Sequence, residues 1–566
     1  MAHTTGDRAF AEALRAEGVR YVFGLPGGHS VRILYDKMAQ TDGIDAVLMR
    51  HETAGAFAAL GYAQISGHAA VCHGTAGPGW SQTIVGVHES YSSRIPMVCI
   101  AAAAPVATYG KGALQEFRQI ENMVGCTKWA YRIDRVDKVP WAVQQAFKHA
   151  FAPPPGPAFL DVPIDVPAAE IDVEPYRPAP RPRAQADEDD VDRAAEMLTQ
   201  AKRPVIVAGR GVHQARAWDE LRALAELLTI PVLHTNHGKT SIPESHPLSA
   251  GGVGVNRTPA SQTMLDSSDC WLWIGSQIEE FAVGHWAPMP PERRFIHADA
   301  DSGNFAKNWN PDVALLGDAQ LVLRQLIAAA KDRLGNHAGG LQPDAPIIQE
   351  IAKLKAQYAQ RVQAQIAASE GPVHPAQLLA EVQRQKDDDA IIVLGEGANR
   401  AWTATQLQID APGHWVSASD FGCMGYCVPA AIGAKLAKPE CQVIALTGDG
   451  SFQMQMHELP VAAQHNAPVT WIIMNNNCLG WIKWGQKMRY DERYYAVDFD
   501  PNWRHAEAAR AAGCQGERVE SPEQLEGAIS AALRANAEGQ SALVEVLIPQ
   551  TEQTDGFVEH HGMASE

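Results

Sequence analysis

The stretch from Val443 to Gly480 constrains the fold more than any other part of the chain. It opens on an apolar run, 443–446, that does not alternate with polar residues and therefore predicts a buried parallel strand. The run leads into a Gly-Asp-Gly turn at 448–450, where glycine lets the backbone turn sharply and approach a ligand. A helical pattern and a second apolar run, 469–474, follow. Strand, loop, helix and strand make a βαβ unit whose two strand ends share one edge of a sheet.

Oxygen-bearing side chains follow both of these strands. Asp449 comes after the first strand, and Asn476 lies in the run of three asparagines after the second. A carboxylate, an amide oxygen and a backbone carbonyl, completed by water and a phosphate, suit Mg²⁺ or Ca²⁺ better than zinc. The N–H groups of Gly450 and Ser451, at the start of the helix, suit that phosphate. A Gly-Asp-Gly turn alone is also an ordinary turn; its spacing from the asparagines favours the metal site.

Composition limits the class of protein. At 566 residues, the chain is long enough for about three or four domains. The net charge of −18 argues against nucleic acid or an anionic membrane as the main partner, and no apolar run is long enough to span a bilayer. The first residues lack a signal-peptide core, and nine scattered cysteines fit a reducing compartment. We therefore expect a cytoplasmic enzyme without nucleic-acid or membrane partners.

Alternating helix and strand patterns predict an α/β fold of three doubly wound domains with mostly parallel sheets. The first domain covers 1–173 and is followed by a linker rich in proline and charge. The second covers 191–332, and the third covers 370–550 and contains the βαβ unit. The first and third domains look like two versions of one architecture.

The βαβ stretch closely resembles the thiamin-diphosphate-binding motif of the pyruvate-oxidase and acetolactate-synthase type. The three-domain plan resembles that family over nearly the whole chain, which implies pyrimidine-binding, central, and diphosphate-binding domains in that order. The resemblance implies that Asp449, Asn476 and the carbonyl of Cys478 hold the Mg²⁺ or Ca²⁺ that anchors the cofactor. It also implies cofactor contacts at Thr75, Ala398, Asn399, Gly422, Met424, Gly448, Gly450, Ser451, Leu479 and Gly480. Met424, in the segment 420–435, would hold the cofactor in a bent shape.

Glu52 is the first catalytic candidate. Thiamin chemistry needs a carboxyl group bonded to the aminopyrimidine ring, and in the resembled family this acid follows a strand of the first domain. Arg50-His51-Glu52 stands at such a place, although a lone glutamate there is more often a solvated surface residue. The family builds each site from the first domain of one chain and the third of another. The resemblance therefore implies a homodimer or homotetramer with shared active sites.

Two further side chains suggest proton transfer near the substrate. His29, next to Gly28 in a Pro-Gly-Gly loop, and Gln115 resemble the corresponding positions of benzaldehyde lyase. A histidine and a glutamine there could relay protons to and from a hydroxyl-bearing intermediate. His73 is another catalytic candidate. A second histidine beside the cofactor would make this site resemble that of a ring-opening cyclohexane-dione hydrolase of the superfamily. The alternative for His73 is a buried histidine at a strand end.

The predicted substrate pocket departs from that of acetolactate synthases. Leu114 and Gly485 stand where those enzymes usually carry phenylalanine and tryptophan. Trp481 and Trp484 suggest a pocket with aromatic walls, to which Gly28 and Leu114 would also contribute.

The acetolactate-synthase branch carries FAD on its central domain. Gly209-Arg210-Gly211 follows a predicted strand, but a Gly-x-Gly alone is a weak signal. The segment 276–284 lacks the acidic-then-arginine pattern expected of a flavin-bound synthase. FAD is possible but not favoured.

The resemblance implies an enzyme that makes or breaks a carbon–carbon bond beside a carbonyl through a carbanion-enamine intermediate. A lyase or carboligase acting on 2-hydroxyketones, aldehydes or 2-oxoacids is the leading hypothesis. An acetolactate-type 2-oxoacid decarboxylase or synthase comes second, and a hydrolase of cyclic diketones comes third. A catalytically silent subunit with the same fold is the non-enzyme alternative, which the presence of Glu52, Asp449 and Asn476 disfavours.

Overall fold

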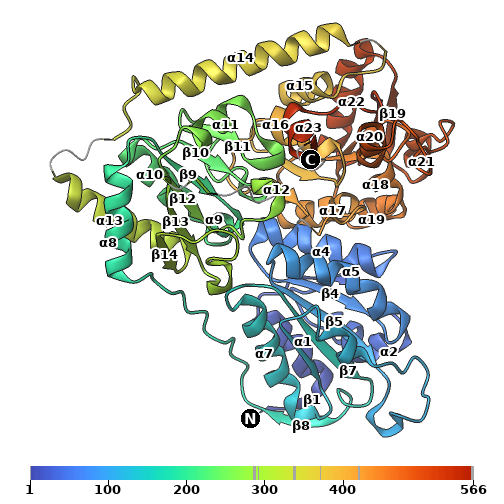
Figure 1. Cartoon of the computed structure of the whole chain (residues 1–566). Coiled ribbons are helices and arrows are strands. Elements are labelled where there is room, and N and C mark those ends of the chain that lie inside the picture. Colours follow the sequence, from blue (N-terminus) through green and yellow to red (C-terminus); the bar gives the residue numbers. More distant parts are fainter. Residues whose placement is uncertain are drawn as a thin grey trace.

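The computed structural model describes residues 2–284, 289–290, 292–335, 340–369, 371–418 and 421–562. These residues form three six-stranded sheets in which all neighbouring strands are parallel, one in each predicted domain (Figure 1). The predicted α/β class with three domains is therefore confirmed. No helix among the described residues has the length and apolar character needed to cross a membrane. Asp420, the first residue of the predicted segment 420–435, lies outside the described residues.

The first sheet has the order β3-β2-β4-β5-β7-β6. Its strands are β3 (Asp45–Leu48), β2 (Tyr21–Gly24), β4 (Ala70–Gly74), β5 (Met97–Ala103), β7 (Pro157–Pro163) and β6 (Trp129–Arg132). Its helices are α1 (Gly6–Ala16), α2 (Gly28–Ser30), α3 (Asp36–Met38), α4 (Glu52–Ser66), α5 (Pro78–Ser93), α6 (Gln119–Met123) and α7 (Val139–Phe151). An antiparallel pair, β1 (Ala2–Thr5) and β8 (Glu170–Val173), joins the start of this domain to its end. The connections from β2 run in opposite directions to β3 and β4, which opens a crevice at the carboxyl ends of these strands.

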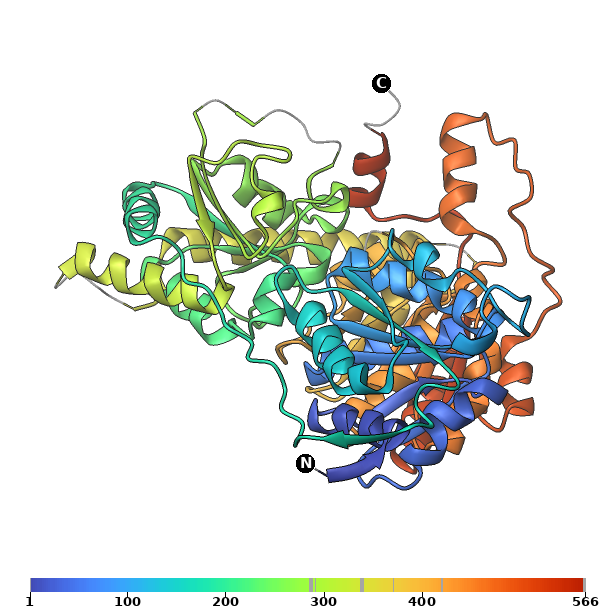
Figure 2. The same cartoon turned by 90° about the horizontal axis from the view of Figure 1, so that it is seen from below.

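The central sheet has the order β11-β10-β9-β12-β13-β14. Its strands are β11 (Ser249–Gly252), β10 (Val232–His234), β9 (Pro204–Ala208), β12 (Cys270–Ile274), β13 (Arg294–Asp299) and β14 (Val313–Leu316). Its helices are α8 (Glu188–Gln200), α9 (Arg210–Gln214), α10 (Trp218–Leu228), α11 (Pro259–Asp266), α12 (Glu280–Val283) and α13 (Ala319–Leu334). Residues 174–187 form neither helix nor strand and run along the outside from β8 to α8 (Figure 2).

The third sheet has the order β16-β15-β17-β18-β20-β19. Its strands are β16 (Trp415–Ser417), β15 (Ile391–Leu394), β17 (Val443–Gly448), β18 (Thr470–Asn475), β20 (Ala542–Leu547) and β19 (Gln515–Val519). Its helices are α15 (Pro375–Gln385), α16 (Asn399–Gln406), α17 (Cys427–Ala437), α18 (Asp449–Gln453), α19 (Leu459–Gln464), α20 (Gly480–Arg489), α21 (His505–Ala511), α22 (Leu525–Ala537) and α23 (Asp555–Gly562). The predicted βαβ unit is present: β17 and β18 are parallel neighbours, with Gly448 opposite Met474.

A long helix that the sequence analysis did not predict, α14 (Pro346–Ala368), connects the central and third domains (Figure 1). Ile347 and Ile348 pack against the core of the central domain. Val362 belongs to the core of the third domain, and Ile366 packs against it. The helix therefore braces the two domains against each other.

The first and third domains meet where α4 crosses α17, at the boundary visible in Figure 1. Both helices are built largely of alanine and glycine and are buried on nearly all sides. A Cβ atom at Gly433 would lie 1.9 Å from the carbonyl oxygen of Ala58, and one at Gly61 would lie 2.1 Å from that of Ala430. The two backbones are thus in direct contact, which only glycine permits at these positions.

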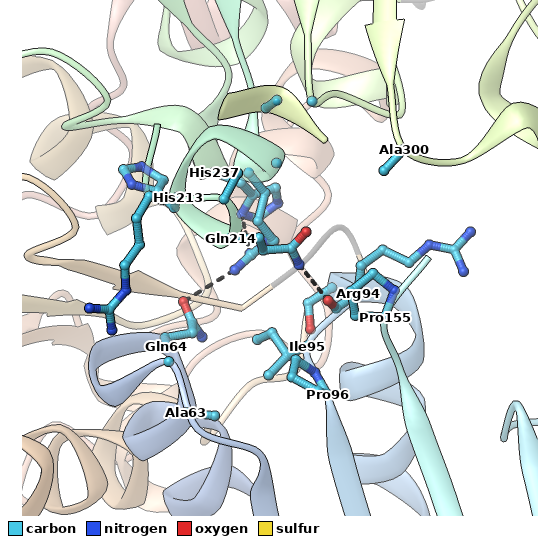
Figure 3. A pocket seen from close by; sticks show the side chains of 18 of the residues that line it. Ala63, Gln64, Arg94, Ile95, Pro96, Pro155, His213, Gln214, His237 and Ala300 are labelled. Atoms are coloured by element: carbon cyan, nitrogen blue, oxygen red, sulfur yellow. Dashed lines mark hydrogen bonds between the residues drawn. The ribbon is translucent and has the colours of Figure 1, made fainter. Parts of the chain in front are cut away.

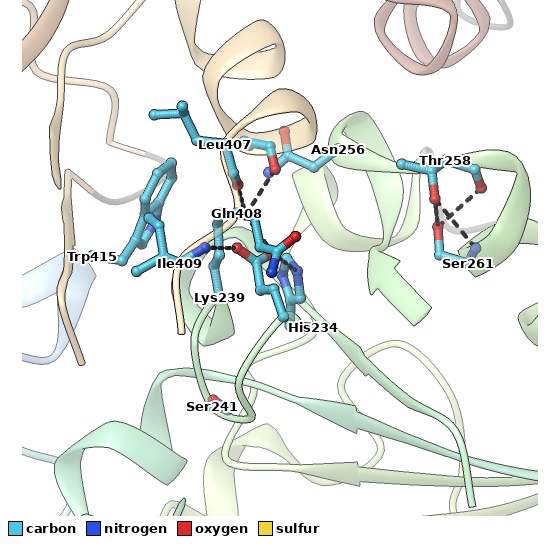
Figure 4. Close-up of polar contacts among 12 residues, drawn as sticks. His234, Lys239, Ser241, Asn256, Thr258, Ser261, Leu407, Gln408, Ile409 and Trp415 are labelled. Atoms are coloured by element: carbon cyan, nitrogen blue, oxygen red, sulfur yellow. Dashed lines mark hydrogen bonds and ion pairs between the residues drawn. The ribbon is translucent and has the colours of Figure 1, made fainter. Parts of the chain in front are cut away.

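A buried ion pair joins the central domain to the third (Figure 4). The Lys239 ammonium group is 1% exposed and lies 2.5 Å from a carboxylate oxygen of Glu244. It also donates hydrogen bonds to the carbonyls of Ala404 and Leu407, at the carboxyl end of α16. Glu244 in turn accepts from the Ile409 N–H at 2.8 Å. Burial opposes its charged form, but Lys239 and His234 lower the pKa of Glu244 to about 2.

We expect Gly433→Ala to destabilise the protein even though alanine is the better helix former. The methyl group would force α4 and α17 apart, and such overpacking costs about 1–3 kcal/mol. Gly527→Ala is the matched control, because Gly527 also lies within a helix and nothing surrounds its Cβ position. Thermal unfolding should show a lower midpoint for Gly433→Ala and an unchanged or higher one for Gly527→Ala. An unchanged midpoint for Gly433→Ala would contradict the close helix crossing.

Candidate cofactor and metal site

The structure brings Asp449 into contact with the loop that follows β18. Asp449 is the first residue of α18 and is 2% exposed. The backbone N–H groups of Asp449, Gly450, Asn477 and Cys478 face its carboxylate and lower its pKa. Asn477 and Cys478 donate hydrogen bonds to Oδ1 of Asn475 and to Oδ1 of Asn476, at 2.9 and 3.2 Å. Asn477 has a φ of 53°, and this left-handed turn directs the loop back towards Asp449. Asp449, Asn476 and Cys478 line one cavity, as the predicted metal site requires.

The electrostatics of Asp449 fit a cation. Burial raises the pKa of its carboxyl group to about 7, although the four backbone N–H groups act in the opposite direction. Its Oδ2 atom is buried and has no hydrogen-bond partner among the described residues, and the same holds for Oδ1 of Asn399. A divalent cation and a phosphate group would supply the missing partners, and the cation would favour the ionised carboxylate. The residues present therefore fit a metal–diphosphate group.

A cavity of about 290 Å³ opens above this loop. The following predicted residues line it: Ala398, Asn399, Gly422, Met424, Gly448, Asp449, Gly450, Ser451, Asn476, Cys478, Leu479, Gly480 and Trp481. Four loops of the third domain and the start of α20 thus converge on one cavity, and these candidates lie together.

Gly480 shows how tightly the loops around the metal site are packed. A Cβ atom at this position would lie 2.4 Å from the side-chain nitrogen of Asn476. Any larger residue would therefore displace Asn476. The predicted phosphate contact of Ser451 involves its backbone N–H. Its side chain acts elsewhere, because the hydroxyl accepts a hydrogen bond from the Gly425 N–H at 2.9 Å. The Ser451 hydroxyl therefore holds the loop that carries Met424 in place. The backbone N–H of Ser451 belongs to the first turn of α18.

Several lining residues were missed by the sequence analysis. They are Phe281, Glu396, Trp402, Met474, Ile482, Ile548, Pro549, Glu552 and Gln553. Phe281 comes from α12 of the central domain, and its ring lies 5.8 Å from that of Trp481. Trp484 was predicted to line the pocket but packs instead against Phe557 of α23, with ring centroids 5.1 Å apart. The sequence contains no signal that joins Phe281 to this cavity, because the contact depends on how the domains pack.

The first-domain candidates gather at a separate edge. Glu52 begins α4 and is 6% exposed, and burial raises the pKa of its carboxyl group. A Cβ atom at Gly79 would lie 3.1 Å from a Glu52 carboxylate oxygen and 2.8 Å from the Thr75 side chain. The Thr75 hydroxyl is buried and lacks a partner among the described residues.

The substrate candidates of the first domain lie on loops at this same edge. The Cβ position of Gly77, two residues after Thr75, is 3.0 Å from the Cβ of Gln115, whose φ is 59°. Gly28 and His29 lie in the short helix α2. The preceding residue, Gly27, packs against Thr75, because a Cβ atom at Gly27 would lie 2.5 Å from the Thr75 hydroxyl oxygen. None of these residues lines the 290 Å³ cavity of the same chain. One chain thus presents two half-sites.

The two other first-domain candidates, His73 and Leu114, do not line the 290 Å³ cavity either. His73 is fully buried, and its Nδ1 lies 3.2 Å from the Tyr35 hydroxyl. Burial lowers the pKa of His73 to about 3, so this imidazole stays neutral. This placement matches the alternative of a buried strand-end histidine. Leu114 is 78% exposed on the surface of the chain.

A second, larger crevice of about 1320 Å³ lies between the three domains (Figure 3). Gly211 borders it, and glycine is required at both Gly209 and Gly211 by contact with Gly275, since a Cβ at either position would lie within 2.6 Å of Gly275 atoms. The guanidinium group of Arg210 donates to Gln64 at 3.2 Å and lies 2.7 Å from the His237 Nδ1. The Gly-x-Gly sequence is therefore explained by packing alone.

The cavity of the third domain fits a cofactor that carries a diphosphate. Residues 4–122, 191–326 and 395–546 match the N-terminal TPP-binding, central and C-terminal TPP-binding domains of thiamine pyrophosphate enzymes. The chain is 32% identical over 560 residues to a probable acetolactate synthase large subunit of Methanocaldococcus jannaschii, covering 97% of this chain and 92% of that protein. It is 31% identical over 498 residues to the large subunit of acetolactate synthase isozyme 1 of Escherichia coli, covering 88% and 86%. The chain belongs to the thiamine pyrophosphate enzyme family.

We expect Asp449→Asn to weaken metal-dependent binding of thiamin diphosphate, because the amide cannot supply the charge that a divalent cation needs. We expect the affinity for the cofactor to fall at least about 10-fold, since mutating residues that only hydrogen-bond to metal ligands already lowers metal affinity about 10- to 100-fold. Titration of the apoprotein with cofactor at a fixed Mg²⁺ concentration measures it. Asp500→Asn, an exposed aspartate on a nearby segment, is the control. Equal affinities for the two variants would contradict the metal site.

Proposed function

We propose that this chain is a Mg²⁺-dependent thiamin-diphosphate enzyme that decarboxylates a 2-oxoacid and joins the acyl fragment to a second carbonyl compound, as an acetolactate-type synthase does. The lining of the 290 Å³ cavity carries the proposal, because it combines the buried Asp449, Asn476 and the loops at 398–399 and 450–451 in one place. The relatives named above are acetolactate synthase large subunits matched over most of their length, which supports the synthase over the lyase that the sequence analysis placed first.

In this proposal, each group has one task. Asp449, Asn476 and the Cys478 carbonyl would hold Mg²⁺, and the N–H groups at the start of α18 would bind the diphosphate. Thiamin diphosphate, when bound, supplies the electron sink for bond cleavage beside a carbonyl. The Glu52 carboxyl group, whose pKa is raised by burial, would hydrogen-bond the aminopyrimidine ring. His29 and Gln115 would transfer protons at the substrate; the likeness to benzaldehyde lyase there stays a prediction.

The separation of the half-sites supports an oligomer. Within one chain, no described residue of the first domain lines the cavity of the third. We propose a homodimer or homotetramer in which Glu52 of one copy completes the cavity of another. The names of the relatives as large subunits also leave room for a small-subunit partner.

A second candidate, an acyloin lyase or carboligase acting on uncharged substrates, is favoured by one feature of the cavity. None of the described residues that line it is a lysine, arginine or histidine, whereas Phe281, Trp481 and Ile482 form an apolar wall. The guanidinium group of Arg400 pairs with the lining residue Glu396 at 2.9 Å and lies over the ring of Phe281, another lining residue. A substrate carboxylate would need a cation from a second copy.

Product analysis distinguishes the two reactions. The protein loaded with thiamin diphosphate and Mg²⁺ is given pyruvate in one reaction and benzoin with an aldehyde in another. We expect CO₂ release and acetolactate from pyruvate. Cleavage or exchange of benzoin with inert pyruvate would replace the synthase by the acyloin lyase. Inactivity in both reactions would contradict both and move the test to cyclic diketones.

We propose that the enzyme works without FAD. The 1320 Å³ crevice is large enough for a dinucleotide, but its glycines are accounted for by packing and Arg210 is engaged with Gln64 and His237. The purified protein should therefore be colourless and release no flavin on denaturation. Release of one flavin per chain, measured by visible absorption and fluorescence, would overturn this expectation.

A further inference from the structure

The loop that carries Glu52 is tied to the third domain of the same chain. The Leu48 N–H donates to Nε2 of His465 at 3.1 Å, and the Arg50 guanidinium donates to Oε1 of Gln464 at 2.6 Å. The Arg50 N–H lies 3.0 and 3.1 Å from the two carboxylate oxygens of Glu458. These acceptors lie on one continuous segment, the short turn Met456–Glu458 and the helix α19 that follows it.

Glu458 is the buried member of this set. Its side chain has no exposed surface, and its carboxylate accepts from the N–H groups of both Arg50 and His51. Burial raises the pKa of Glu458 to about 7, and the two N–H groups act in the opposite direction. A buried carboxylate is costly unless it is hydrogen-bonded, so its presence here points to the geometry that it imposes.

We infer that Glu458 is a positioning residue for Glu52. It fixes the backbone of the two residues immediately before Glu52, and His51 is the N-cap of α4, whose first residue is Glu52. The direction in which the Glu52 side chain leaves the helix therefore depends on Glu458. The inference rests on the proposed function in one respect, namely that Glu52 is the acid bonded to the cofactor.

Glu458 also connects the two half-sites of a chain. The segment from Asp449 through α18 to the turn at 456–458 carries the proposed metal ligand at one end and Glu458 at the other. Through this segment, the metal loop of a chain and the Glu52 of the same chain are held by one rigid stretch of backbone. If sites are shared between copies, each such segment spans two active sites.

The experiment measures a step earlier than turnover, the exchange of the thiazolium-carbon proton of the bound cofactor for deuterium, by quenched-flow NMR. Glu458→Asp keeps the charge but withdraws the carboxylate by one methylene, so we expect exchange to slow by about 10- to 100-fold, the scale for a displacement near 1 Å. Glu458→Gln keeps one oxygen at the original reach and should slow exchange less. Cofactor affinity should stay unchanged in both variants, because Glu458 does not line the cavity.

Two reference variants separate the possible failures. Glu244→Gln also alters a buried carboxylate that accepts a backbone N–H across a domain boundary, yet it lies far from the Glu52 loop in sequence and joins other domains. It should lower the unfolding temperature and leave exchange unchanged. Exchange at the wild-type rate in Glu458→Asp, or an equal slowing in Glu244→Gln, would overturn the inference. Unchanged exchange in Glu52→Gln would instead overturn the role of Glu52 in the proposed function.

Discussion

The crossing of α4 over α17 is the contact on which the rest of the site depends. Because both helices present alanine and glycine, their backbones touch, and the Cβ positions of Gly433 and Gly61 are already occupied by carbonyl groups of the other helix. Because the two helices pack this closely, neither can shift along the other without steric clashes. Protein interiors are packed as densely as organic crystals, so even one added methyl group disturbs them. Glu52 stands at the amino end of α4. The helix crossing and the Glu458 hydrogen bonds therefore fix its place relative to the third domain by two independent contacts.

Buried carboxylates have three different partners in this molecule, and the differences follow their roles. Glu244 faces the Lys239 ammonium group, which lowers the pKa of its carboxyl group and makes the pair a fixed joint. Glu458 faces the backbone N–H groups of Arg50 and His51 and lies 3.4 Å from Nε2 of His457, so it positions a loop. Asp449 also faces N–H groups but keeps one oxygen without a partner among the described residues. That remaining oxygen leaves Asp449 able to bind a cation, in contrast to Glu244 and Glu458.

Much of the third-domain site could be predicted because the chemistry lies at strand ends. Apolar runs without alternation gave β17 and β18, and parallel strands end at the same edge, so Asp449 and Asn476 had to meet. The helix α14 was missed because the Gly- and Pro-containing stretch before it suggested a loose connection, although Ile351, Tyr358 and Val362 recur at helical spacing. Phe281 and Glu458 could not be found from local pattern. Each acts across a domain boundary, and a glutamate beside a helix start reads as solvated until its burial is known.

The composition of the cavity wall limits which substrate the two half-sites can accept together. The third-domain cavity contributes carboxylates at Glu396, Asp449 and Glu552 and an apolar wall, but no cationic side chain among its described lining residues. Mg²⁺ would neutralise part of this negative charge, and the diphosphate would add to it. A 2-oxoacid therefore has to find its counter-charge on the loops that a second first domain brings, where Arg118 is exposed beside Gln115 and the exposed Phe117. If those loops supply no cation near the reacting carbon, an uncharged acyloin or aldehyde fits this cavity better than a 2-oxoacid. Burying an unpaired carboxylate against the apolar wall would cost more free energy than burying an uncharged substrate. In the proposed oligomer, the first domain of the partner copy would decide between synthase and lyase, whereas the third domain would hold the cofactor.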